Sequence, residues 1–543
     1  MRRLFASIGS FAGRLLFLLV SLVWLAAGAL LGTLVGRALV ALLSLKIHVW
    51  RELELALWIS FGLLGMIAAG QFWATRFPAY APRRGGVHGS AHFADERQVR
   101  GSLGGSNGLI VGRENRRGGQ LLRYAGQAHL ITIAPTRSGK GVGAIIPNLL
   151  TTERSVLCID PKGENARVTA GARRRLGPVH VLDPFGVSGQ PSAAFNPLER
   201  LAPDSLDLAE DAALLADALV HDPPGQVGEA HWNEEAKALI AGVILHVVHH
   251  EAPELRTLAT VRHLLTSSPH EFRTMLEIMQ KSASASGLIA RAANRHLGKS
   301  EREAAGVLSS AQRHTHFLDS QRIAQVLGRS DFEFAHLKTG RATVFLVLPP
   351  DRLGTHARWL RLLVAQAISE LARSPARSAE PVLFLLDEFA ALGRLEPVER
   401  AFGLMAGYGL QLWPILQDLH QLWSTYGERA GTFLSNAGLV QVFNVADVDT
   451  ASWVSKSIGS TTLSYQTTGT SVSKGPGPFL FTQTTNSTST SVHLTRRELL
   501  TPDEVMRLEP WLEILLRQGH APAIAQKVRY FADPEFRGLY ELA

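Results

Sequence analysis

The stretch HLITIAPTRSGKGVGAIIPNLL, His129 to Leu150, decides the fold of this 543-residue chain. An apolar segment of strand length, Leu130 to Ile133, leads into a loop ending in Gly139 and Lys140, and a short apolar helix is expected after the loop. Phosphate binding requires this order, because N–H groups of the loop and helix N-terminus point at the anion while the lysine reaches the outer phosphates. We therefore predict a nucleotide phosphate loop whose contact residues are Ala134, Pro135, Thr136, Arg137, Ser138, Gly139, Lys140, Gly141 and Val142. The alternative is a glycine-containing turn with an incidental lysine.

The loop departs from the common GxxxxGK[ST] pattern at two positions. Ala134 replaces the first glycine, which is a mild change. Gly141 stands where a hydroxyl would usually contact magnesium, so that metal ligand is unassigned. Thr136, Ser138 or a water molecule are the candidates to replace it.

A second element, EPVLFLLDEFAAL from Glu380 to Leu392, contains an unbroken apolar run at Val382 to Leu386. Such a run is typical of a central strand buried on both faces. It ends in Asp387 and Glu388. A phosphate-loop enzyme holds magnesium at this strand tip, and the next acidic residue can polarise water, so Asp387 is the candidate metal ligand and Glu388 the candidate general base. A helix N-cap followed by a first-turn acid is the alternative.

A third strand, QLWPIL at Gln411 to Leu416, ends at Gln417. An amide at that tip is a candidate catalytic contact with the γ-phosphate, whereas a surface amide that opens a helix is equally compatible with the local pattern.

Composition excludes several classes of protein. Hydrophobic residues make up 46% of the chain and charged residues only 19%, which excludes a disordered chain, collagen and a coiled-coil rod. One cysteine, Cys158, excludes a disulfide framework. The net charge of +8 is modest for this length, so it permits nucleic-acid binding without arguing for it.

The positive mean hydropathy, +0.07, comes largely from the first eighty residues. Leu15 to Gly36 is uncharged and long enough to cross a bilayer, and Leu55 to Trp73 is about the minimum length. We therefore predict two transmembrane helices. Basic residues lie outside both spans, so we expect both termini in the cytoplasm and a short external hairpin at residues 37–54; these residues are Arg2, Arg3, Arg14, Arg76, Arg83 and Arg84, against Arg37, Lys46 and Arg51 between the spans.

Together these motifs resemble the TraG-like family of type IV secretion coupling proteins, the membrane-anchored ATPases of conjugative DNA transfer. PTRSGKGVG at Pro135 to Gly143 has the family's form of the loop, including the glycine after the lysine. The other matching motifs are GSAHFA at Gly89 to Ala94, DPKGE at Asp160 to Glu164, FNPL at Phe195 to Leu198, LDEFAALGRL at Leu386 to Leu395, GYGLQL at Gly407 to Leu412, QDLHQL at Gln417 to Leu422 and a YF-D element at Tyr530 to Asp533. The resemblance extends from the predicted spans nearly to the C-terminus.

The expected fold is α/β: a RecA-like P-loop NTPase with a mainly parallel, doubly wound sheet, an inserted all-α domain and a two-helix transmembrane anchor. We divide the chain into an anchor at residues 1–80, a first part of the nucleotide domain at 81–202, an all-α domain at 203–330 and a second part at 331–543. DPKGE follows a short strand, so Lys162 and Glu164 are expected near the nucleotide or a subunit boundary, with a plain turn as the alternative.

The resemblance implies a two-pass protein of the bacterial inner membrane with a cytoplasmic ATPase body. It implies ATP and Mg²⁺ as cofactors, and a homo-hexamer that passes relaxase-bound single-stranded DNA, or a protein substrate, to the proteins of a type IV secretion channel. The alternative is a receptor for protein effectors in which ATP binding serves assembly, without DNA pumping. Arg394 and Arg400 are candidate arginine fingers by location alone.

Three further features leave alternatives open. The second half of the helical segment is basic and faces either substrate phosphates or solvent; its candidates are Arg291, Arg295, Lys299, Arg302 and Arg313. His246, His249 and His250 lack a third metal ligand at a suitable spacing, which favours ordinary surface histidines. Half of the residues from Ser460 to Thr495 are Ser or Thr, and the segment reads either as a disordered linker or as a polar β-hairpin at the membrane-facing side or channel mouth.

Overall fold

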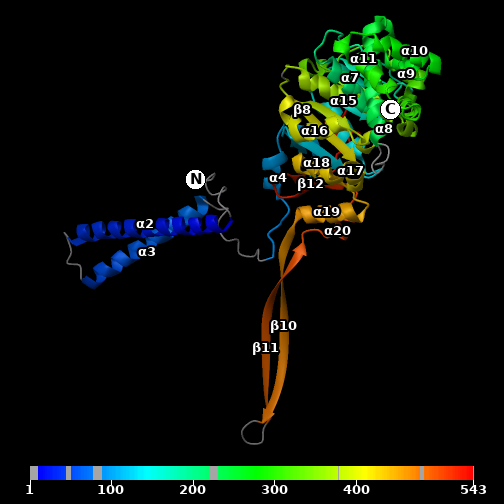
Figure 1. Cartoon of the computed structure of the whole chain (residues 1–543). Coiled ribbons are helices and arrows are strands. Elements are labelled where there is room, and N and C mark those ends of the chain that lie inside the picture. Colours follow the sequence, from blue (N-terminus) through cyan, green and yellow to red (C-terminus); the bar gives the residue numbers. More distant parts are fainter. Residues whose placement is uncertain are drawn as a thin grey trace. The chain divides into compact units, whose positions relative to one another are not determined.

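The computed structural model describes residues 10–44, 51–76, 88–220, 230–376, 378–476 and 482–541. The chain divides into two compact units, Met1–Val87 and His88–Ala543. The first contains two helices, α2 (Ser10–Ser44) and α3 (Arg51–Arg76), and the second contains every strand of the described residues (Figure 1).

Both predicted membrane segments are helical, but they differ in length. Within the described residues, the apolar part of α2, Leu22–Leu42, is long enough to cross a membrane, whereas the apolar part of α3, Leu55–Ala69, is shorter. One span is therefore supported, and the second stays a prediction. The two helices approach closely through glycines: a Cβ at Gly32 would lie 2.1 Å from the Phe61 carbonyl oxygen, and one at Gly65 would lie 2.2 Å from that of Gly28.

An eleven-stranded mixed sheet forms the second unit, in the order β2-β1-β13-β12-β9-β3-β8-β7-β4-β6-β5. The strands from β9 to β5 are parallel to their neighbours; they are β3 (His129–Ile133), β4 (Val156–Asp160), β5 (Val179–Leu182), β6 (Thr343–Val347), β7 (Val382–Leu386), β8 (Leu410–Leu416) and β9 (Ala437–Phe443). An antiparallel extension contains β1 (Leu109–Glu114), β2 (Leu121–Tyr124), β12 (Leu512–Arg517) and β13 (Ala523–Gln526). The prediction of a mainly parallel sheet is confirmed, and the antiparallel extension was not foreseen.

Helices cover both faces of the parallel strands. Successive side chains of a strand point to opposite faces, so a strand that is apolar at every position must be covered on both sides. On β4, Leu157 and Ile159 belong to one apolar cluster together with α15 (Pro350–Arg373). Val156 and Cys158 belong to another, with Leu149 of α5 (Ile146–Thr151), and α6 (Glu164–Arg174) packs on α5. This is the doubly wound arrangement that apolar strands without alternation require.

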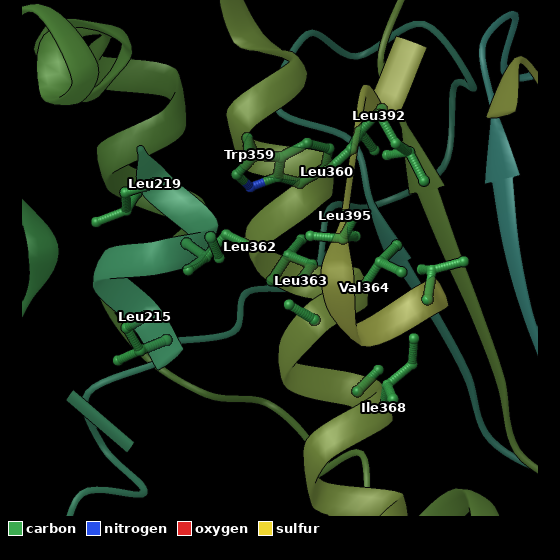
Figure 2. Packing of buried hydrophobic residues seen from close by; sticks show 14 of the residues in the cluster. Leu215, Leu219, Trp359, Leu360, Leu362, Leu363, Val364, Ile368, Leu392 and Leu395 are labelled. Atoms are coloured by element: carbon green, nitrogen blue, oxygen red, sulfur yellow. The ribbon is translucent and has the colours of Figure 1, made fainter. Parts of the chain in front are cut away.

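All described elements between β5 and β6 are helical. They are α7 (Leu208–Leu219), α8 (Ala230–His250), α9 (Leu258–Leu265), α10 (Pro269–Gln280), α11 (Leu288–Leu297), α12 (Glu301–Thr315), α13 (Gln321–Val326) and α14 (His336–Thr339). Figure 2 shows how α15 joins this helical segment to the sheet: leucines and Trp359 of α15 pack against Leu215 and Leu219 of α7, and also against Leu392 and Leu395 beyond β7.

The remaining helices lie at the ends of the sheet or beside its later strands. They are α4 (Glu96–Leu103), α16 (Glu396–Leu404), α17 (Leu419–Tyr426), α18 (Ala430–Asn436), α19 (Val448–Ile458) and α20 (Pro502–Met506). Their starts follow from local sequence: Asp95 and Gln98 form a capping box on α4, and Thr501 and Glu504 form one on α20.

The Ser/Thr-rich segment is a β-hairpin, which decides between the two alternatives in its sequence. Its strands are β10 (Ser460–Pro476) and β11 (Thr482–Glu498), paired in one unbroken register from Ser460 opposite Glu498 to Pro476 opposite Thr482. We call this hairpin the arm. Figure 1 shows it as a long orange ribbon that projects from beside α19 and α20.

Candidate nucleotide-binding site

The predicted site residues come from strands that are neighbours in the sheet. The order β3-β8-β7-β4 places the loops after these strands side by side at the carboxyl edge, where open α/β sheets bind ligands. A cavity of about 380 Å³ lies there. It is lined by Thr136, Arg137, Gly139, Lys140, Gly141, Val142, Asp160, Pro161, Lys162, Glu164, Asn165, Pro350, Leu353, Asp387, Glu388 and Gln417.

The loop after β3 has the backbone geometry of an anion cradle. Arg137 and Gly139 both have positive φ, 64° and 94°, and they alternate with residues of ordinary φ, which turns successive N–H groups toward one side. A Cβ at Gly139 would meet no atom within 4 Å, so the backbone here borders open space. The Gly143 N–H then bonds the Gly139 carbonyl at 2.8 Å and begins the helix.

Lys140 lies between the two carboxylates that follow β7. Its Nζ is 2.8 Å from Asp387 Oδ1 and 2.6 Å from Glu388 Oε1. Burial alone would lower the pKa of Lys140, but the two carboxylates outweigh it and raise that pKa overall. The lysine is therefore charged, and phosphate oxygens would compete with the carboxylates for it.

Gln417 completes this cluster from the tip of β8. Its Nε2 donates to Glu388 Oε2 at 3.1 Å, and its Oε1 accepts from Thr136 Oγ1 at 3.5 Å. Glu388 has a positive φ of 50°, a costly conformation for a non-glycine residue that often marks a functional position. Its N–H donates to Asp387 Oδ1 at 2.9 Å, which holds the two acids in fixed relation. The structure thus brings together Lys140, Asp387, Glu388 and Gln417.

Two carboxylates of the cavity are strongly buried. Burial raises the pKa of Asp387, despite the opposing effect of Lys140. Burial also raises the pKa of Asp160 to about 6, although backbone N–H groups, including that of Ala166 at 2.8 Å, favour its ionised form. Carboxylate oxygens that border a cavity suit a divalent cation, which would relieve this desolvation. The donor set therefore fits Mg²⁺.

Of the nine predicted loop contacts, six line the cavity: Thr136, Arg137, Gly139, Lys140, Gly141 and Val142. Ala134, Pro135 and Ser138 do not. Ala134 is fully buried at the end of β3, where its N–H donates to the Leu416 carbonyl. The Ser138 Oγ is buried and has no hydrogen-bond partner among the described residues, whereas Thr136 faces the cavity. Thr136 is thus the better placed of the two candidate hydroxyls.

Sequence reasoning missed Lys527, which follows β13. Its Nζ donates to the Ser138 carbonyl at 3.0 Å and also bonds Asn444 Oδ1. Burial lowers its pKa to about 8. Lys527 thereby ties the end of the chain to the phosphate loop, and no local pattern around it indicates that contact. Asp160, the first residue of the DPKGE motif, also lines the cavity, and its local sequence alone does not indicate a role there.

Lys162 and Glu164, expected near the nucleotide or a subunit boundary, line the cavity, whereas the candidate arginine fingers and the basic residues of the helical segment do not. Arg394 and Arg400 are each about half exposed and lie near Glu399 and Glu396, respectively. In the helical segment, Arg295 and Lys299 both pair with Glu235, at 2.7 and 3.0 Å, which favours the solvated-face interpretation for these two.

The histidines of α8 are not all at the surface. His246 is buried and His250 exposed, so the expectation of surface histidines is wrong for His246, whose side of α8 packs into the helical core. Within the described ranges, no group of three or more His, Cys, Asp or Glu side chains is arranged to hold a metal.

The mainly parallel sheet, with the loop after β3 and the acids after β7 at its carboxyl edge, has the RecA-type NTPase fold. The family model of type IV secretory system conjugative DNA transfer matches residues 93–539. This chain belongs to that family, the coupling proteins of type IV secretion.

Two named proteins, TraG and VirD4, are similar to this chain in sequence. The conjugal transfer protein TraG of Escherichia coli is 28% identical over 501 residues, which cover 83% of this chain and 78% of TraG. VirD4 of Agrobacterium fabrum is 30% identical over 437 residues, 78% of this chain and 62% of VirD4.

Solved structures of a plasmid coupling protein, TrwB, share the fold. The complex with a non-hydrolysable ATP analogue has a TM-score of 0.61 at 17% identity, covering 84% of this chain and 98% of that one. The complex with ADP and Mg²⁺ has a TM-score of 0.61 at 16% identity, covering 82% and 95%.

Proposed function

We propose that this coupling protein binds ATP with Mg²⁺ in the cavity after β3, β7 and β8, and that hydrolysis drives passage of relaxase-bound single-stranded DNA into a type IV secretion channel. The observation that carries the proposal is the position of Lys140. It lies within 2.8 Å of Asp387 and 2.6 Å of Glu388, beside an anion cradle. A positive charge, two acids and a loop whose backbone N–H groups can face an anion are what phosphoryl transfer to water needs.

Each side chain has a distinct role. Lys140 binds the outer phosphates, and Glu388 orients and deprotonates the attacking water. Gln417, held against Glu388, contacts the γ-phosphate. Asp387 would hold Mg²⁺, with Thr136 or water in place of the hydroxyl that Gly141 lacks, and the metal would neutralise charge on the phosphates. TrwB, which shares the fold, has been solved in complex with ADP and Mg²⁺ and with nucleotide analogues, which supports nucleotide and Mg²⁺ as the ligands.

The anchor is proposed to cross the inner membrane twice, with the ATPase body in the cytoplasm. The close glycine contacts of α2 and α3 support a paired helical hairpin, since small residues let helix backbones approach in lipid. Arg37 lies over the ring of Trp58 at 4.6 Å, which further joins the two helices.

A homo-hexameric ring is the proposed working form. In such a ring a neighbouring subunit supplies an arginine to the γ-phosphate, and the half-exposed Arg394 and Arg400 are available for that contact.

The test of nucleotide use is the Lys140→Ala variant of the full chain in detergent. It is expected to lose ATP binding and hydrolysis, while Lys456→Ala, which removes an exposed lysine on α19, keeps both. Hydrolysis at the parent rate by Lys140→Ala would overturn the proposal.

A second candidate function is a receptor for protein effectors. It is favoured by the pairing of Arg295 and Lys299 with Glu235, which reduces the basic surface open to DNA. Binding of single-stranded DNA by the full chain should weaken steeply as salt rises, because phosphate contacts release counterions. A flat or absent response would favour the receptor.

A further inference from the structure

The arm has two long strand edges whose backbone groups lack partners. Residues before α4 cover only the root of β10: Ser90 lies opposite Thr461, and the Ala91 N–H donates to the Ser460 carbonyl at 3.0 Å. Beyond this root, β10 and β11 form a sheet of two strands only, within the residues that the structure describes. A two-stranded ribbon is at best marginally stable alone in water.

The direction of each backbone group can be assigned. Gly459 turns its carbonyl inward, where it accepts from the Leu499 N–H at 2.9 Å, and Ser460 turns its carbonyl outward to Ala91. Backbone groups alternate along a strand, and the register is unbroken. The even-numbered residues of both strands, such as Thr470 and Thr488, therefore present their N–H and C=O groups at the outer edges.

The usual protections of such an edge are sparse along the described part of the arm, where the charged residues lie only toward its two ends, at Lys474 and at Arg496, Arg497 and Glu498. Its strands have no register shift, and between Thr461 and Val492 only Lys474 is charged and only Pro476 is a proline within β10 and β11. Native edges that avoid pairing carry charges, prolines or bulges. The side chains from Thr467 to Val472 and from Ser487 to Val492 are exposed, so none of them covers an edge.

The two faces of the ribbon differ in bulk. Partners opposite each other share a face, so in the part of the arm beyond Gln466 one face carries mostly small residues, namely Thr467, Gly469, Ser471, Ser487, Ser489 and Ser491; nearer the root the same face carries Leu463, Tyr465 and His493. The other carries branched ones, namely Thr468, Thr470, Val472, Thr488, Thr490 and Val492. A sheet that closes into a ring crowds the side chains of its inner face, so beyond Tyr465 and His493 this asymmetry suits curvature with the smaller side chains inside.

We infer that the arms of neighbouring copies pair edge to edge, β11 of one copy against β10 of the next, and close into a β-barrel around the axis of the ring. This inference rests on the ring assembly proposed above. The partner of each edge is a second copy of this chain. Each arm has one β10 edge and one β11 edge, and the two strands run antiparallel. In a closed ring, β10 of each copy can therefore pair with β11 of the next, and every edge has a partner. The edges from Thr461 to Ser473 and from Thr482 to Val492 carry no charge, so they add no repulsion between identical chains.

Disulfide cross-linking between two differently tagged full-length chains tests the pairing. One carries Thr467→Cys on β10, and the other carries Ser487→Cys, Ser489→Cys or Ser491→Cys on β11. These odd-numbered positions are chosen because outward pairing of even residues makes odd residues the close, non-hydrogen-bonded pairs between copies. The natural Cys158 is buried, so the parent chain gives the background.

We expect oxidation to cross-link the two chains at one β11 position at least about fivefold more than at the others, as a fixed register requires. Two chains that both carry Thr467→Cys should stay at background, because β10 does not face β10 within a ring. Equal yields at all positions, or no cross-link above background at any, would overturn the inference. If the protein formed oligomers but no cross-links, the barrel would be excluded and the ring would still stand. If it were a monomer without cross-links, both the ring and the barrel would be excluded.

A proline variant keeps the test independent of folding. Thr470→Pro removes one outward N–H and should reduce the cross-link between copies several-fold, whereas Thr470→Val keeps that N–H and the cross-link. An intrachain disulfide between Thr468→Cys and Thr490→Cys, which are directly opposite, reports that the hairpin still forms. If Thr470→Pro left the cross-link between copies unchanged, edge pairing at this position would be excluded.

Discussion

The parallel strands of the sheet and the strands of the arm both contain many β-branched residues. Polar side chains are buried and hydrogen-bonded to one another in the sheet, but they are exposed in the arm. Inside the sheet, side-chain hydrogen bonds of 2.7 Å run from Trp413 to Thr132, from Thr132 to Gln441 and from Gln441 to Glu513, across four neighbouring strands. Along the arm, Thr468, Thr470, Thr488 and Thr490 are exposed to solvent. A hydroxyl therefore belongs to a buried hydrogen-bond network inside the sheet, whereas in the arm it is exposed and favours solubility.

The largest effect is expected from a substitution of Glu388, the candidate base at the carboxyl edge of the parallel strands. Glu388→Gln keeps the size of the side chain but removes its basicity, so ATP hydrolysis should fall by at least ~100-fold while ATP still binds. The rate is measured with the full chain in detergent. The matched control is Glu498→Gln at the root of the arm, which should hydrolyse ATP at the parent rate. A Glu388→Gln rate within about threefold of the parent would exclude the base role.

A pair of identical substitutions tests the contrast in polar groups. Thr132→Val deprives Trp413 and Gln441 of their shared partner and should lower the free energy of unfolding by ~1–3 kcal/mol. Thr468→Val in the arm should change it by less than ~0.5 kcal/mol. Thermal unfolding of both variants checks this, and equal effects would contradict the distinction between the two regions.

The buried end of the same chain of hydrogen bonds predicts a pH dependence. Burial raises the pKa of Glu513 to about 8, while an unfolded glutamate ionises near 4.5. The folded parent thus binds a proton that the unfolded chain releases, so its stability falls as the pH rises from 4.5 to 8. Glu513→Gln does not titrate, and its stability relative to the parent should rise by about 1 kcal/mol between pH 6 and pH 7. A difference that is independent of pH would show that Glu513 is ionised in the folded protein.

The smallest expected effect is at Gly141. A Cβ there would meet no atom within 4 Å, so Gly141→Ser should fold and hydrolyse ATP. The new hydroxyl should lower the Mg²⁺ concentration needed for half-maximal activity about two- to fivefold, since it restores a metal ligand. Gly431→Ser, also open in space, is the control that should leave this concentration unchanged. An unchanged Mg²⁺ requirement in Gly141→Ser would place the metal away from this position.

The parallel strands and the residues at their carboxyl ends could be predicted from the sequence, because the runs of apolar residues are the segments that the fold buries. Val382 to Leu386 is apolar at every position, and it is fully enclosed between two helical layers. The positions of Asp387 and Gln417 at strand ends then followed from how parallel strands align.

Other features depend on contacts distant in sequence. Lys527 reaches the Ser138 carbonyl across 389 residues, and no local pattern specifies that contact. The arm's composition was compatible with two states until its strand pairing decided between them. The apolar part of α3 ends at Ala69, although the uncharged run continues to Trp73 and includes the polar Gln71, so the absence of charge alone overestimates the length of a span.

The central claim is that ATP hydrolysis at the Lys140, Asp387, Glu388 and Gln417 cluster drives substrate transfer. The most direct measurement compares the substrate transfer frequency of cells that produce Glu388→Gln with the ATPase rate of the same protein, at equal amounts in the membrane. The proposed motor predicts that transfer falls together with hydrolysis, by at least ~100-fold. Transfer at the parent level with hydrolysis abolished would contradict the motor and leave nucleotide binding with a role in assembly alone.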